Sequence, residues 1–169
     1  TQACGGIKLV VMCKDACTKT CGMHTIVKVE EAAKSVTDFI EEHKPHLKDR
    51  RAFEEGRLVI KPDGEKGAFV PKFREAMRLQ GYGVEESAPN QPNENNAEAA
   101  IGRWKKKSIT LITDASIPAK YFPLVMRYLC QIFNIVSCTG NSNNMSPYEA
   151  MTGLRVSVRE LLPLFTLCW

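Results

Sequence analysis

The stretch IKLVVMCKDACTKTCGMHTIVKV, residues 7–29, carries the first fold signal of the chain. Residues 7–13 are a short, dense apolar run, which predicts a buried strand. Residues 14–22 predict a turn. Residues 23–29 are β-branched and partly alternating, which predicts a second strand. The stretch therefore predicts a β-hairpin.

Apolar residues at helical spacing follow the hairpin, from Val29 to His43, and Pro45 marks the end of this predicted amphipathic helix. Residues 44–56 are charged and predict a surface loop or a frayed helix. The same criteria predict strands at 57–61 and 83–88, and helices at 71–80, 95–112 and 121–136. This order is typical of an α/β domain with a small mixed sheet.

The segment SPYEAMTG, residues 146–153, predicts a compact helix. Ser146 can cap its N-terminus, Pro147 suits the first helical position, and Glu149 can close a capping box. Gly153 is typical of the residue that ends a helix.

Composition limits the class of protein. With 169 residues, the chain can form one domain with a hydrophobic core, and its net charge of +4 permits an acidic partner without requiring one. No apolar run approaches the roughly 18 residues of a membrane span. The N-terminus has neither a charged n-region nor a cleavage signature. We therefore expect an intracellular protein of the nucleus or the cytoplasm.

Four of the seven cysteines, Cys4, Cys13, Cys17 and Cys21, crowd the N-terminus. An odd number of cysteines in a chain of this length favours reduced thiols over a secreted disulfide framework. Cys13, Cys17 and Cys21 could instead form a zinc site with His24, although their spacing fits the usual C-x2-C pairing poorly. The role of these cysteines stays open.

Four longer blocks carry a resemblance that covers nearly the whole chain. They are GGIKLVVMCKDACTK (5–19), VIKPDGEKGAF (59–69), ESAPNQPNENNAEAAIGRWKK (86–106) and MSPYEAMTGLRVSVRELLPLF (145–165). In this order and at this spacing they resemble the catalytic core of retroelement integrases, and the last block looks like the copia-type retrotransposon polyprotein. The resemblance implies a ribonuclease H-like mixed sheet flanked by helices. It makes residues 1–112 the core region and 113–169 a helical continuation of the same domain.

The resemblance also implies a metal site, because this family holds two divalent ions, Mg²⁺ or Mn²⁺, with two Asp and one Glu. Asp63 matches the second Asp and Glu98 the Glu, at the family's spacing. Carboxylates are the ligands that hard cations prefer, and two such ions can promote phosphodiester transfer. Taken alone, Asp63 is typical of a turn and Glu98 of the first turn of a helix. Glu94 competes with Glu98 for the ligand position.

The implied function is DNA integration, by 3′-end processing of the element's DNA and strand transfer to a target. The implied partners are the element's cDNA ends, target DNA and further integrase copies in a homo-oligomer. Arg103, Lys105 and Lys106 are candidate contacts to DNA phosphates, and Lys105 follows Glu98 by two helical turns on the same side. A solvated helix face is the alternative for these cations.

The family's first Asp would stand at or upstream of Thr1, on a strand that normally lies in the middle of the sheet. We therefore expect this chain alone to be inactive. Pro62 also replaces a small polar residue of the family and cannot donate a ladder hydrogen bond. Two alternatives follow: a degenerate, non-catalytic integrase-like module that binds nucleic acid, and a cysteine-based zinc-binding interaction domain.

Overall fold

The predicted hairpin is present in the computed structural model, which describes residues 9–28, 30–46, 58–62, 69–85 and 96–157. β1 (Leu9–Lys14) and β2 (Cys21–Ile26) pair antiparallel. In the turn, the Asp15 carboxylate accepts hydrogen bonds of 2.6 Å from the backbone N–H and the hydroxyl of Thr18. The Asp15 N–H donates to the Thr20 carbonyl at 2.8 Å. An Asp side chain bonded to the backbone ahead of it therefore holds the turn.

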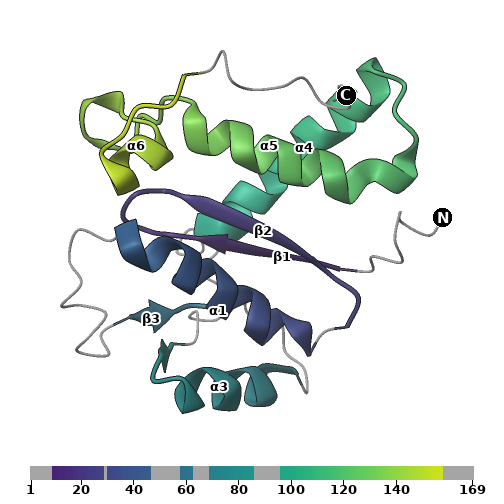
Figure 1. Ribbon diagram of the computed structural model, residues 1–169. Helices are drawn as coiled ribbons and strands as arrows, with labels where there is room; N and C mark the ends of the chain where they lie inside the picture. Colours follow the sequence, from purple (N-terminus) through teal and green to yellow (C-terminus); the bar gives the residue numbers. More distant parts are fainter. Residues whose placement is uncertain (1–8, 29, 47–57, 63–68, 86–95, 158–169) are drawn as a thin grey trace, which may run out of the picture.

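α1 (Glu31–His43) covers one face of the hairpin (Figure 1). Its buried residues recur at helical spacing, so one stripe of the helix faces the strands. Within this stripe, Phe39 lies so close to Gly22 that a Cβ atom at position 22 would stand 2.2 Å from Cδ2 of the ring. Glycine at this strand position therefore permits the close approach of the helix. A short 3-10 turn at Lys44–His46 ends the helix at the predicted Pro45.

A second strand pair follows, in which β3 (Val59–Ile60) and β4 (Gly83–Val84) are parallel. α3 (Phe69–Leu79) connects them, because parallel strands need a crossover. Backbone hydrogen bonds of 3.1 and 3.0 Å join the two segments. Both strands are shorter than predicted, and positions 57 and 86–88 of the predicted strands lie outside the described residues.

The described strands form two separate pairs, one antiparallel and one parallel, and the single mixed sheet stays a prediction. In Figure 1, β3 is drawn on the opposite side of β1 from β2. The two-residue strands of the second pair offer few backbone groups for pairing, and α1 links the two pairs by contacting both the hairpin and α3. The α/β class itself is confirmed.

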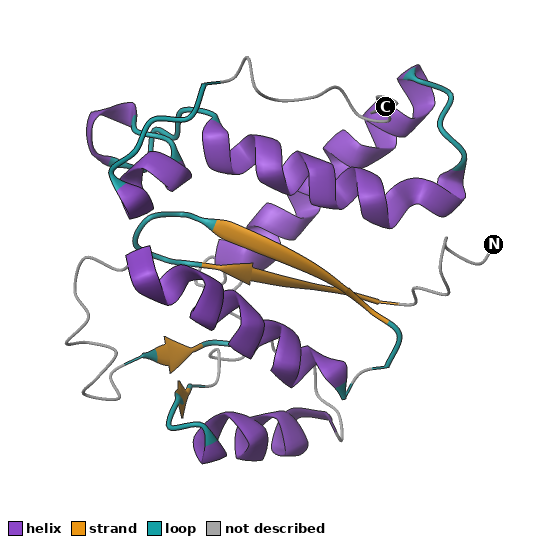
Figure 2. Cartoon of the chain, viewed as in Figure 1, coloured by secondary structure: helices purple, strands orange, loops and turns teal. Residues whose placement is uncertain are grey.

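α4 (Asn96–Asp114) and α5 (Phe122–Ile135) cross on the other face of the hairpin (Figure 2). The core cluster consists of Cys21, Met23, Trp104, Met126 and Cys130, with Val10, Met12, Phe122 and Phe133 packed against it. Trp104 is 3% exposed, so it is a core residue and does not offer its ring as a platform for base stacking. Of the helices in the described part of the chain, none combines the length and apolarity needed to cross a membrane.

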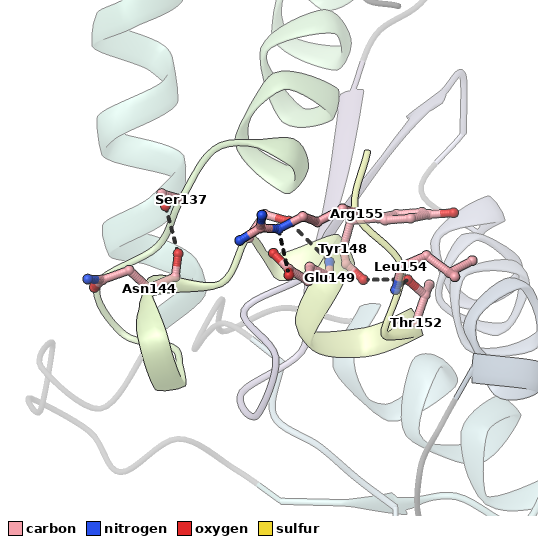
Figure 3. Close-up of polar contacts among 8 residues, drawn as sticks. Ser137, Asn144, Tyr148, Glu149, Thr152, Leu154 and Arg155 are labelled. Atoms are coloured by element: carbon pink, nitrogen blue, oxygen red, sulfur yellow. Dashed lines mark hydrogen bonds and ion pairs between the residues drawn. The ribbon is translucent and has the colours of Figure 1, made fainter. Parts of the chain in front are cut away.

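α6 (Pro147–Thr152) is the predicted compact helix. The Ser146 hydroxyl accepts a hydrogen bond of 3.1 Å from the Glu149 N–H, and Gly153 ends the helix in a left-handed conformation with φ of 77°. The Glu149 carboxylate accepts a hydrogen bond from Nε of Arg155 at 3.2 Å (Figure 3). The predicted capping box is therefore half formed, because this carboxylate pairs with Arg155 instead of the Ser146 N–H.

Candidate nucleic-acid interface

α4 carries one predicted metal ligand and all the predicted DNA-binding cations. Glu98 lies in the first turn of this helix, as predicted. Asp63, the other predicted ligand, follows β3 in the chain and lies outside the described residues. The described side chains include no group of three or more His, Cys, Asp or Glu that could hold a metal ion. The two predicted ligands are thus placed only by their order along the chain.

A buried stripe determines the orientation of α4. Ala100, Trp104 and Ser108 are 2%, 3% and 0% exposed, and they recur every four residues, so they lie on one side of the helix. The three predicted DNA-binding residues, Arg103, Lys105 and Lys106, are exposed, as is Lys107. These cations are therefore available to bind phosphate groups.

The predicted cations do not share one face of α4. Each residue of an α-helix is rotated by about 100° from the one before it, so Arg103 and Lys105 project from nearly opposite sides, with Lys106 between them. Lys105 follows Glu98 by two helical turns and shares its side, as predicted. Arg103 shares its side with Lys107, which follows it by one turn. The structure therefore divides one predicted cluster into two surfaces.

No cation of α4 takes part in an ion pair within the described part of the chain. The ion pairs found there are Lys44–Glu41, Lys61–Glu85 and Arg155–Glu149. Lys107 instead holds its Nζ 4.9 Å from the centroid of the Phe133 ring. That ring is itself 5.4 Å from the ring of Trp104. A cation above an aromatic face keeps its positive charge, so Lys107 remains able to attract an anion.

Lys14, at the end of β1, lies near Arg103. Met12 packs against the core cluster that contains Trp104, and Lys14 faces the same side of the strand because alternate residues share a face. Burial lowers the pKa of Lys14, and the positive charges of Arg103 and Lys19 act in the same direction. The hairpin and α4 therefore bring several cations to one part of the surface.

The cysteines considered as zinc ligands do not converge. Cys13 stands opposite Gly22, on the face that α1 covers, whereas Cys21 belongs to the core cluster on the other face. Burial raises the pKa of both thiols to about 12. Cys17 is exposed in the turn, and Cys4 lies outside the described residues. The described geometry therefore gives no support to a zinc-binding domain.

Sequence analysis missed a cleft of about 570 Å³ between β2, α1 and α5. Along β2, every second residue directs its backbone N–H and carbonyl away from β1, and those of Cys21, Met23 and Thr25 point toward this cleft. The Asn134 side chain accepts from the Cys21 N–H at 2.9 Å and donates to its carbonyl at 2.7 Å. Burial lowers the pKa of His24, which also lines the cleft. No local pattern could have indicated the Asn134 contact, because its partner is 113 positions away.

No similarity to a known protein helps to interpret this geometry. No protein-family model matches the chain, and no curated protein matches it either. The exposed cations of α4 are the described feature with the clearest chemical capacity, which is to bind the phosphate groups of a polyanion.

Proposed function

We propose that this chain is the catalytic-core region of a copia-type retrotransposon integrase, which acts in metal-dependent DNA strand transfer. The observation that carries the proposal is the position of α4. The helix begins at Asn96, so that Glu98 falls in its first turn and the exposed Lys105 follows two turns later on the same side. A metal-binding carboxylate and a phosphate-binding cation on one side of a helix suit a nucleic-acid substrate.

The β3–α3–β4 unit supports the same proposal. Asp63 follows β3 in the chain, and Glu98 follows β4. The carboxyl ends of parallel strands meet at one edge of a sheet, where ligand sites of α/β folds commonly form. Under the proposal, Asp63 and Glu98 hold Mg²⁺ or Mn²⁺ at this edge, since carboxylate oxygens are the donors that these ions prefer. The bound ions would supply activation of the attacking oxygen and stabilisation of the leaving oxygen.

The separation of the two strand pairs fits the ribonuclease H-like form of the proposal. In the family, the first acid lies on a central strand, and none of the described strands corresponds to it. β1–β2 and β3–β4 are not hydrogen-bonded to each other, and a strand between β1 and β3 would join them. We propose that such a strand, which would carry the family's first acid, completes both the sheet and the ligand set, and that the site is inactive without it.

The test uses the protein extended upstream of Thr1 and a labelled duplex of the element's terminal sequence. We expect nicking and strand transfer that require Mg²⁺ or Mn²⁺ and that are abolished by Asp63→Ala and by Glu98→Ala. Glu94→Ala is the matched control and should leave activity unchanged. Activity that survives both Asp63→Ala and Glu98→Ala would refute the assignment of these residues.

A non-catalytic nucleic-acid-binding module is the second candidate. The observation that favours it is the set of exposed α4 cations without ion pairs among the described residues. This candidate predicts duplex binding that weakens with salt but responds neither to Mg²⁺ nor to Asp63→Ala. The same extended protein distinguishes the two candidates, because only the integrase would join DNA strands. Further copies of the chain are expected partners of the integrase, since joining two DNA ends requires more than one active site.

A further inference from the structure

The side of α4 opposite Lys105 adjoins the hairpin turn. Arg103 and Lys107 project from this side, and Lys107 lies over Phe133. Lys14, which ends β1, lies near Arg103, and Lys19 follows within the turn near Lys14. These four residues, Lys14, Lys19, Arg103 and Lys107, are named the hairpin-side patch.

The hairpin turn is held in place by contacts from a distant part of the chain. The Asn141 side chain donates to the Thr18 carbonyl at 2.9 Å, and the Thr20 hydroxyl donates to the Pro147 carbonyl at 3.2 Å. A Cβ atom at Gly140 would stand 3.4 Å from Cε of Lys19, so the loop before α6 packs directly against this lysine. Because the turn is docked at several points, Lys19 is held in place near Lys14 before any ligand arrives.

The hairpin turn also carries one acidic side chain, Asp15. Asp15 lies between Lys14 and Lys19 in the sequence, and its carboxylate accepts two hydrogen bonds from Thr18. None of the ion pairs among the described residues includes Lys19, Arg103 or Lys107. The four cations of the patch outnumber the one carboxylate of the turn, and this excess of positive charge creates a positive potential that attracts anions.

We propose that the hairpin-side patch is a second binding surface for the phosphodiester backbone of double-stranded DNA, separate from the side of α4 that carries Glu98 and Lys105. The patch itself follows from the described contacts and charges, and only the choice of DNA rests on the proposed function. Phosphate contacts position a duplex without reading its sequence, so the patch would bind DNA of any sequence. Two surfaces on opposite sides of one helix would allow the protein to hold two DNA segments at once.

The expected size of the effect follows from counterion release. Each phosphate bound by a cation changes the logarithm of the binding constant by about 0.9 per tenfold change in salt. Relative to 1 M salt, one bound phosphate therefore strengthens binding roughly eightfold at about 0.1 M salt. Removing the charges of Arg103 and Lys107 should weaken binding by about eightfold for each phosphate that is no longer bound, and should lower the salt slope by about 0.9 for each such phosphate.

The experiment measures binding of the full chain to a labelled random-sequence duplex by fluorescence anisotropy over a range of salt. The test variant is Arg103→Gln with Lys107→Gln. The matched control is Lys72→Gln with Arg78→Gln, which removes the same charge from exposed positions on α3. We expect the test variant to show the weaker binding and the lower slope. Binding within twofold of the control variant would overturn the proposal.

A charge-preserving variant, Arg103→Lys with Lys107→Arg, separates charge from folding. It should retain the binding that the test variant loses, and a loss of binding in both variants would overturn the electrostatic explanation. A single-stranded RNA of equal length tests the choice of ligand, and tighter binding of the RNA than of the duplex would overturn that choice.

Lys105→Gln makes failure of this proposal distinguishable from failure of the proposed function. If Lys105→Gln weakens DNA binding while the test variant does not, the hairpin-side patch is refuted and the integrase proposal stands. If the test variant weakens binding while strand transfer is absent from the extended protein, the patch stands and the integrase proposal fails.

Discussion

Replacement of Gly22 by alanine should destabilise the fold, because the strand position leaves no room for a methyl group. A Cβ atom there would lie 2.2 Å from Cδ2 and 2.7 Å from Cε2 of Phe39. Phe39 is only 8% exposed, so its ring cannot turn out into solvent without losing its packing against the hairpin. Overpacking of this kind costs about 1–3 kcal/mol. In a chain of this size, the melting temperature should fall by roughly 3–9 °C.

Urea unfolding followed by circular dichroism measures this change in the free energy of unfolding. Gly102→Ala is the control, because Gly102 lies inside α4, is exposed, and has no atom within 4 Å of its added Cβ. Alanine there should stabilise the protein by about 0.5–1 kcal/mol. Phe39→Leu should relieve the clash, so that Gly22→Ala costs less in that background by at least about 0.5 kcal/mol. Equal costs in both backgrounds would refute the argument from steric overlap.

Four further predictions concern stability and thiol chemistry. Ser146→Ala should lower the free energy of unfolding by about 1 kcal/mol in urea titrations, because the N-cap of α6 is lost. Asn134→Ala should cost about 1–3 kcal/mol by the same measurement, because it leaves the outward N–H of Cys21 without its hydrogen bond and the Cys21 carbonyl with the Cys130 thiol as its donor, and a cost below about 0.5 kcal/mol would contradict this. Iodoacetamide should modify the exposed Cys17 in the folded protein and Cys130 only after unfolding, because burial raises the pKa of the Cys130 thiol to about 12; equal labelling rates would argue against burial. Burial of the neutral Cys130 thiol contributes stability that is fully present below the ordinary pKa of 9.0 and is lost as the pH rises to about 12. The free energy of unfolding should therefore fall over this pH range. In Cys130→Ala the fall should be smaller.

The sequence predicted those helices and strands whose position depends on residues close together in the chain. The hairpin, the helices and the start and end of α6 depend on apolar periodicity and on capping residues such as Ser146 and Gly153, and each was found close to its predicted position. The second strand pair was predicted less well. Its strands are only two residues long, and whether they join the hairpin depends on hydrogen bonds between segments that no periodicity specifies.

The candidate site likewise has features that local sequence predicted and features that depend on tertiary packing. The positions of Glu98 in the first turn of α4 and of Lys105 two turns later follow from where the helix begins, which the change from turn formers to helix formers already indicated. The grouping of Arg103 with the hairpin could not be predicted, because it depends on which side of α4 Trp104 buries against β1, β2 and α5. Asp63 stays a prediction, since it lies outside the described residues.

The sequence by itself determined the elements, their order and the exposed, basic character of α4, because these properties depend on neighbouring residues and on the 3.6-residue repeat of a helix. Only the tertiary structure decided which cations of α4 share a surface with the hairpin, how closely Phe39 approaches Gly22, and which side chain bonds the outer edge of β2. The physical reason is that these features are contacts between residues far apart in the chain, and they depend on how the elements pack against one another.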